Sequence, residues 1–131
     1  MCDGAPTPSR AAARVAVVWS GCRLLTVTEV TTGELATAIE AGAVVYDVRE
    51  THEYVKGHVP GVALLPMSEI EQRWEEIPAD KGTVYMVCAT GARSGRVAEA
   101  LRQAGVDAVN VAGGTKAWAE EGRPLETGQP R

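Results

Sequence analysis

The sequence lacks phenylalanine, and aromatic residues make up only 5% of its 131 residues. Hydrophobic residues still account for 45% of the chain, which excludes an intrinsically disordered protein and supports a folded core. That core must be built mainly from valine, leucine, isoleucine and alanine. A chain of this length is sufficient for one domain of ordinary size.

Cysteine and histidine are also scarce. The three cysteines are Cys2, Cys22 and Cys88, and only two histidines accompany them. An odd number of widely spaced cysteines excludes a disulfide framework and forms no metal-ligand pattern. We therefore predict free thiols in a reducing cytoplasm, without a bound metal.

Long apolar runs and an excess of basic residues are both absent. No run approaches the roughly 18 apolar residues of a membrane span, and the net charge is −4. We predict neither a membrane nor a nucleic-acid partner, because nucleic-acid binding usually needs a strongly basic surface.

The N-terminal stretch "SRAAARVAVVWSGC" has some features of a lipoprotein signal. However, Arg14 interrupts its apolar run, and Trp19 fits poorly near a cleavage site. We predict a poorly ordered extension over residues 1–22 instead, then a single domain over 23–128 and a tail over 129–131.

Within that domain, apolar runs alternate with helical patterns. We predict strands at 24–28, 43–48, 63–67, 83–88 and within 108–114. We predict helices at 31–42, 49–57, 68–78, 94–104 and 115–122. Thr31 and Glu34 have the spacing of a capping box at the start of the first helix. Such alternation with short connections predicts an α/β fold, with a parallel sheet covered by helices on both faces.

The stretch "VCATGARSGRVAEAL" places Cys88 where a buried strand turns toward a helix. Free N–H groups in a curled loop and at a helix start attract anions, and the same field stabilises a thiolate. Arg93 adds a positive charge, and Gly91 suits a backbone conformation that other residues rarely adopt. A cysteine at a strand end is often only a small core residue. The neighbouring glycine, arginine and helix favour a reactive thiol here.

Three segments together resemble the rhodanese-like domains, a family of sulfurtransferases. They are "YDVRETHEYVKGHVPGVALLPM", the loop "VCATGARS" and "VAGGTKAWAEEGRPLETG", which lie in the family's order within residues 24–128. The resemblance implies a three-layer α/β/α domain around a five-stranded, mainly parallel sheet.

The resemblance also implies a chemistry. Cys88 would take the outer sulfur of thiosulfate or a related small anionic donor, hold it as a persulfide, and pass it to cyanide or a thiol, including a protein thiol. The implied substrate-binding residues are Ala89, Thr90, Gly91, Ala92, Arg93 and Ser94. No organic cofactor is implied. Arg93 would pair with the anionic donor, since its fork suits oxyanions.

The other motif residues are predicted to support the site. We expect Asp47 and Arg49 to pair with each other or with loop backbone, although Asp47 could instead line the site. His58 is expected to bond backbone in the "GHVPG" turn. Trp74 and Trp118 are expected to pack in the core.

Two alternatives remain open from the sequence. A rhodanese-like module could act as a sulfur carrier or regulatory binding domain on a partner protein. A cysteine phosphatase or arsenate reductase is disfavoured, because those phosphatases place five residues between cysteine and arginine. Here four residues separate Cys88 from Arg93.

Overall fold

The computed structural model describes residues 19–20, 23–24, 28–78 and 82–129. Five parallel strands form one sheet in the order β3-β7-β6-β4-β5. The strands are β3 (Glu29–Val30), β4 (Val44–Asp47), β5 (Ala63–Leu64), β6 (Val84–Val87) and β7 (Ala108–Val111). The predicted five-stranded α/β fold is confirmed, and every pairing in the sheet is parallel.

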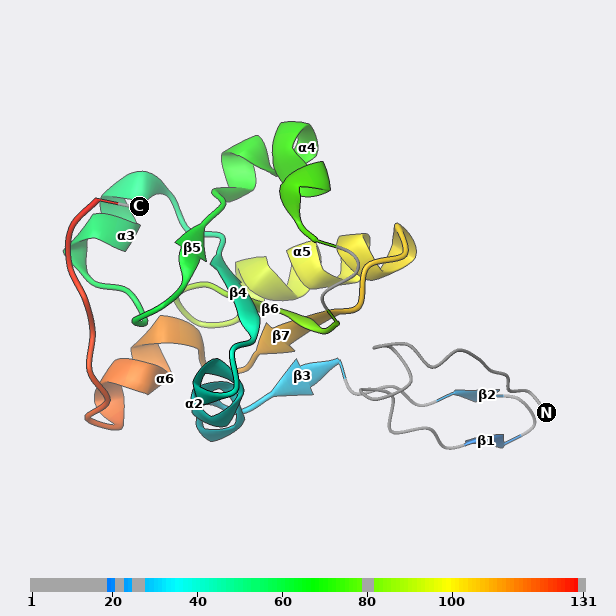
Figure 1. Cartoon of the computed structure of the whole chain (residues 1–131), viewed down its shortest axis with the longest axis horizontal. Helices are drawn as coiled ribbons and strands as arrows, with labels where there is room; N and C mark the ends of the chain where they lie inside the picture. Colours follow the sequence, from blue (N-terminus) through cyan, green and yellow to red (C-terminus); the bar gives the residue numbers. More distant parts are fainter. Residues whose placement is uncertain (1–18, 21–22, 25–27, 79–81, 130–131) are drawn as a thin grey trace.

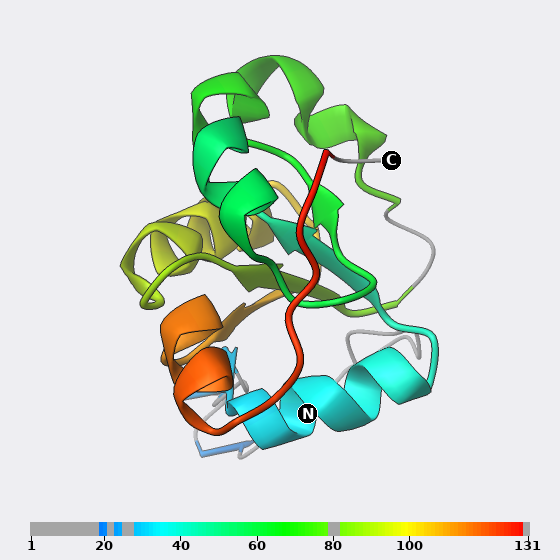
Figure 2. The same cartoon turned by 90° about the vertical axis from the view of Figure 1, so that its left-hand side faces the viewer.

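The helices are α2 (Thr32–Glu40), α3 (Thr51–Lys56), α4 (Ile70–Arg73), α5 (Ala92–Gln103) and α6 (Gly114–Glu120), with short 3₁₀ turns at Met67–Glu69 and Trp74–Glu76. They lie on both faces of the sheet (Figures 1 and 2). Core residues of α5 and the segment around α4 pack on one face, whereas those of α2, α3 and α6 pack on the other. This is the predicted three-layer arrangement.

Strand alternation decides which side chains meet which helices. Val84 and Met86 of β6 face α5, while Val87 belongs to the cluster on the opposite face. Side chains along a strand point alternately to the two faces. Cys88 therefore returns to the α5 face, and it belongs to the same core cluster as Met86.

The first predicted strand was misplaced. The sheet begins at β3, after the predicted range 24–28, and Leu24 instead lies in β2 (Arg23–Leu24), which pairs antiparallel with β1 (Trp19–Ser20). Apolar content alone cannot locate strand ends. The apolar run at 24–28 therefore resembles a strand, although the strand in the sheet begins after it. Apart from Trp19–Ser20, the predicted extension at 1–22 lies outside the described residues, as do Cys2 and Cys22.

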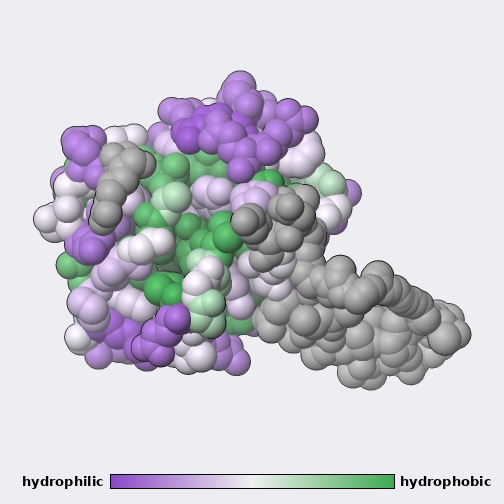
Figure 3. All heavy atoms as spheres, viewed as in Figure 1, coloured by the Kyte–Doolittle hydropathy of each residue, from purple (hydrophilic) through white to green (hydrophobic). Residues whose placement is uncertain are grey.

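Other boundaries differ more modestly. The predicted helix at 68–78 is broken into α4 and its flanking 3₁₀ turns, since the backbone leaves the α region at Glu69 and Arg73. The charged side chains of this segment form a polar cap (Figure 3). Helix α5 begins two residues earlier than predicted, at Ala92. The capping box of Thr31 and Glu34 is confirmed.

The C-terminal segment follows α6 back across the domain and passes beside α3 (Figure 1). Glu126 and His58 exchange two backbone hydrogen bonds of 2.8 Å each. The end of the predicted domain is therefore attached to the turn at His58. Within the described residues, no helix is long and apolar enough to cross a membrane.

Candidate functional site

Cys88 lies immediately after β6, the central strand of the sheet. It is 1% exposed, and its sulfur lies at the carboxyl edge of the parallel strands, where α/β folds commonly bind ligands. The thiol is buried among core residues on one side and is enclosed by its own loop on the other. The strand thus places the Cys88 sulfur at the edge of the core.

The loop after Cys88 curls around the sulfur. The Gly91 amide donates a hydrogen bond of 3.1 Å to Cys88 Sγ, and helix α5 begins at the next residue. Gly91 has a φ of +105°, which confirms the predicted conformation. A Cβ at this position would also lie 3.3 Å from the Val111 carbonyl oxygen. Only glycine satisfies both requirements without strain.

The glycine turn of Gly113 and Gly114, at the start of α6, holds this loop from the other side. The amides of Thr115 and Lys116 donate to the carbonyls of Cys88 and Ala89 at 2.8 and 2.9 Å. A Cβ on Gly114 would lie 2.4 Å from the Cys88 carbonyl oxygen, so the two backbones touch. Because the Cys88 and Ala89 carbonyls point toward α6, the amides of the residues that follow point toward the sulfur.

The surroundings of Cys88 favour the thiolate. Burial raises the pKa of the thiol, but hydrogen bonds from the Ser94 hydroxyl and from the amides of Ser94, Gly91 and Thr90 more than offset that effect. The net result is a pKa below the usual value for cysteine. A thiolate is the nucleophilic form, so this environment suits a reactive sulfur.

Ser94 lies behind the sulfur and is completely buried. Its hydroxyl oxygen is 3.3 Å from Cys88 Sγ and also hydrogen-bonds the side-chain oxygen of Asn110 on β7. Ser94 therefore contacts the Cys88 sulfur directly, from the core side of the loop.

Arg93 pairs with a residue that the sequence did not single out. Its two terminal nitrogens bond both carboxylate oxygens of Glu53 on α3, at 2.9 and 3.0 Å. Hydrogen bonding to Arg93 is the main cause that lowers the pKa of the Glu53 carboxyl to about 2. The same bond raises the pKa of Arg93. The Arg93 guanidinium thus already has a carboxylate partner.

Asp47 and Arg49 form a buried ion pair at the end of β4. Arg49 Nη2 lies 2.9 Å from Asp47 Oδ2 and also donates to the Gly57 carbonyl at 2.7 Å. The predicted pairing is confirmed. It ties the end of β4, beside β6, to the far end of α3.

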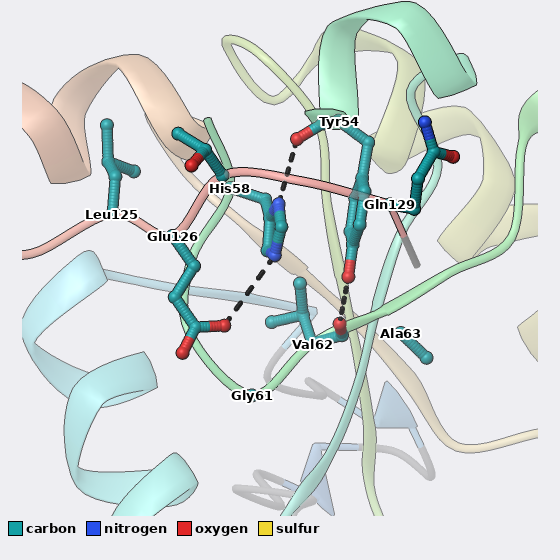
Figure 4. A pocket seen from close by; sticks show the side chains of 9 residues that line it. Tyr54, His58, Gly61, Val62, Ala63, Leu125, Glu126 and Gln129 are labelled. Atoms are coloured by element: carbon teal, nitrogen blue, oxygen red, sulfur yellow. Dashed lines mark hydrogen bonds and ion pairs between the residues drawn. The ribbon is translucent and has the colours of Figure 1, made fainter. Parts of the chain in front are cut away.

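His58 lies at a separate cavity of about 690 Å³, between the α3–β5 connection and the C-terminal segment (Figure 4). Its Nδ1 bonds the Tyr54 carbonyl at 2.8 Å, and the two rings stack with centroids 3.7 Å apart. The predicted backbone bond is confirmed. Glu126 approaches the other ring nitrogen at 3.7 Å. The described residues that line this cavity do not include the Cys88 loop, so His58 holds the turn and the chain end.

The described part of the chain contains no group of three or more histidine, cysteine or acidic side chains that could hold a metal. Trp118 is buried as predicted, and its indole donates to the Pro124 carbonyl. Trp74 packs half-buried against the core.

Sequence reasoning missed Glu53 and Asn110. Each had a weak signal: Glu53 lies within the first rhodanese-like segment, and Asn110 is a polar residue inside the buried strand β7. Their partners, however, lie 40 and 16 residues away in the chain. Only the folded arrangement shows which groups they contact.

Comparison with known proteins agrees with this geometry. The chain is 44% identical over 73 residues to the uncharacterised protein YqhL of Bacillus subtilis, covering 55% of this chain and 57% of YqhL, which is less than two thirds of that relative. It is 40% identical over 80 residues to a sulfurtransferase of Allochromatium vinosum, covering 60% of this chain and 74% of that protein.

A crystal structure of a rhodanese-like domain protein from Staphylococcus aureus superposes with a TM-score of 0.69 at 36% identity. The superposition covers 78% of this chain and 99% of that one. Residues 31–121 match the family described as rhodanese-like domain. With its parallel sheet, its cysteine loop and this match, the chain belongs to the rhodanese-like domain family.

Proposed function

We propose that this protein is a sulfurtransferase that carries sulfur as a persulfide on Cys88. One observation carries the proposal. The Cys88 sulfur lies at the end of the central strand, where the Gly91 amide and the Ser94 hydroxyl lie within hydrogen-bonding distance of it. Sulfurtransfer is also the activity in the name of the Allochromatium relative.

Thiosulfate is the donor that we propose first. The Cys88 thiolate attacks the outer sulfur of thiosulfate, a new S–S bond forms, and the old S–S bond breaks. Sulfite leaves with the electron pair of the broken bond. The negative charge then resides on the outer sulfur of the Cys88 persulfide.

The second half of the reaction returns the enzyme to its thiolate. Cyanide or a thiolate attacks the outer sulfur, and the bond to Cys88 Sγ breaks with its electrons staying on Sγ. Thiocyanate or an acceptor persulfide leaves. The Gly91 amide stabilises the charge that reappears on Sγ, because a donor fixed in the backbone costs no reorganisation during the reaction.

In this scheme the Arg93 guanidinium contacts both Glu53 and the anionic donor. Its side chain is 36% exposed, so a small anion can approach the guanidinium while Glu53 still holds it. The bidentate pair keeps Arg93 beside the loop, although it also offsets part of the attraction for an anion. We therefore propose that Arg93 positions the donor with modest affinity.

The test is the intact mass of the protein after incubation with thiosulfate, and again after addition of cyanide. A Cys2→Ala/Cys22→Ala variant, which keeps Cys88 as its only cysteine, should gain one sulfur and lose it to cyanide as thiocyanate. Cys88→Ala should do neither. If the Cys88-only protein gains no sulfur from thiosulfate, that donor is wrong; if it also gains none from mercaptopyruvate or a protein persulfide, the sulfurtransferase proposal fails.

The same experiment separates the carrier alternative. Transfer of the sulfur to a protein thiol without transfer to cyanide would indicate a sulfur carrier that serves a partner. Hydrolysis of p-nitrophenyl phosphate by wild type, lost in Cys88→Ala, would instead support a phosphatase.

A further inference from the structure

A chain of hydrogen bonds runs from the Cys88 sulfur into the sheet. The Ser94 oxygen lies 3.3 Å from Sγ and bonds the side-chain oxygen of Asn110. The Asn110 amide nitrogen then donates to a carboxylate oxygen of Glu29 at 2.9 Å. The chain thus connects α5, β7 and β3 behind the nucleophile.

The fold places Asn110 there for clear reasons. Ala108 of β7 faces α5, so strand alternation puts Asn110 on that face as well. Parallel register sets Glu29 directly beside it on β3. A Cβ on Gly95 would lie 3.4 Å from the Asn110 amide nitrogen, so the Asn110 side chain packs closely against α5 at this position.

The orientation of the Asn110 amide follows from its neighbours. Its nitrogen lies 2.9 Å from a Glu29 carboxylate oxygen and 3.1 Å from the Gly91 carbonyl, and both of these groups only accept hydrogen bonds. The amide oxygen must therefore face Ser94. Because that oxygen cannot donate, the Ser94 hydroxyl is the donor in this contact.

A hydroxyl carries a single proton and can donate it to one acceptor at a time. We propose that Asn110 is a positioning residue that competes with Cys88 for the Ser94 proton. With a neutral thiol, the S–H group donates to the Ser94 oxygen, and Ser94 donates to Asn110. With a thiolate, the hydroxyl turns to the sulfur, and the Asn110 oxygen loses its donor.

The turn of the hydroxyl breaks no covalent bond, and the proton lost from the thiol passes to solvent. A buried carbonyl oxygen without a donor is unfavourable, so Asn110 raises the free energy of the thiolate relative to the thiol. If the proposed function holds, the persulfide carries its charge on the outer sulfur, and the hydroxyl returns to Asn110. Asn110 would then favour the sulfur-loaded enzyme over the bare thiolate.

Several charged groups lie around this chain of hydrogen bonds. The variants used in the test must leave these groups unchanged. Arg93 on α5 is close enough to interact electrostatically with Cys88 and with Asp47 of β4. Asp47 is paired with Arg49, and Arg93 is paired with Glu53 of α3. Glu29 of β3 loses its contact when Asn110 is replaced, so Glu29→Ala, which removes this contact and keeps Asn110, serves as a separate control.

The experiment is the pH dependence of alkylation of Cys88 by iodoacetamide, in the variant whose only cysteine is Cys88. Ser94→Ala should raise the apparent pKa of the thiol by about half a unit or more. Asn110→Leu should lower it by a similar amount, since Ser94 is then free to donate to sulfur. In a Ser94→Ala background, Asn110→Leu should change nothing.

A merely structural role for Asn110 predicts a different pattern. Loss of its bond to the Gly91 carbonyl would loosen the loop and raise the pKa, with or without Ser94. That result, or the same shift in both backgrounds, overturns the proposal. If Asn110→Leu does not fold by circular dichroism, Asn110→Ala removes the same acceptor with less bulk and is judged by the same criteria. Alkylation needs no sulfur donor, so a failed loading experiment would count against the proposed function alone.

Discussion

Glu53 and Arg93 form a bidentate ion pair between α3 and the start of α5, with N–O distances of 2.9 and 3.0 Å. Arg93 is the cation within the loop from Cys88 to Ser94. The pair therefore leaves this loop with little net positive charge. Glu53 also accepts a bond from the Glu50 amide at 3.0 Å, which fixes its carboxylate at the start of α3.

Replacing Glu53 by glutamine should strengthen the binding of an anionic donor. The amide can still accept a bond from Arg93 but no longer neutralises its charge, so more of the guanidinium's field acts on the donor. For thiosulfate, the donor proposed above, we expect the concentration at half-maximal rate to fall severalfold. Glu99→Gln, on an exposed position of α5, makes the same change in net charge away from the loop. Equal effects of the two variants would show that the ion pair does not control donor affinity.

The Glu53 carboxyl should make the free energy of unfolding fall at low pH. Its pKa is about 2 in the folded protein, against an ordinary value of 4.5. A lowered folded pKa gives stabilisation that is complete above the ordinary value and is lost as the pH falls toward 2. Urea unfolding should be measured for both proteins across this pH window. The free energy of unfolding of wild type should exceed that of Glu53→Gln by an amount that shrinks as the pH falls. Parallel curves for the two proteins would contradict the lowered pKa.

Gly114→Ala should disturb both stability and the cysteine loop. Its φ is +58°, and the new Cβ would lie 2.4 Å from the Cys88 carbonyl oxygen. Gly105 is a matched control, because its φ is +95° but a Cβ there would meet nothing within 4 Å. We expect Gly105→Ala to cost about 1–2 kcal/mol from backbone strain alone.

Gly114→Ala should cost more than this control in urea unfolding, and it should also change the rate of Cys88 alkylation. The extra cost comes from moving one of two touching backbones. Identical losses of stability, with unchanged alkylation in both variants, would refute the contact between the glycine turn and the loop.

The Asp47–Arg49 pair should be far more sensitive than an ion pair at the surface. Asp47→Leu leaves the buried Arg49 guanidinium without its carboxylate, which should cost about 3–5 kcal/mol in unfolding free energy. Arg73 pairs with Glu69 and Glu76 near the surface, so Arg73→Met should cost at most about 1 kcal/mol.

The double variant Asp47→Leu/Arg49→Met tests the cause. If the loss reflects an unpaired buried charge, removing Arg49 as well should restore part of the stability. No recovery in the double variant would indicate that packing at Asp47, and not the charge, was responsible.

Local patterns in the sequence were enough for the alternation of strands and helices from α2 onward and for the local backbone at Cys88. The apolar run that ends at Cys88, the positive-φ glycine at 91 and the following helix all depend on neighbouring residues. The capping box of Thr31 and Glu34 has the same local origin. Strand ends were less predictable, because residues beside a strand can be as apolar as those within it.

The surroundings of Cys88 depended on the tertiary structure. Glu53 and Arg93 lie 40 residues apart in the chain, and Glu29 and Asn110 lie 81 apart. The second contact follows from strand order and register: β3 neighbours β7, so Glu29 lies beside Asn110. A sequence pattern records what each residue can donate, accept or bury. Which groups meet is decided when the sheet assembles, because pairing between distant strands sets the distance and direction of every side chain along them.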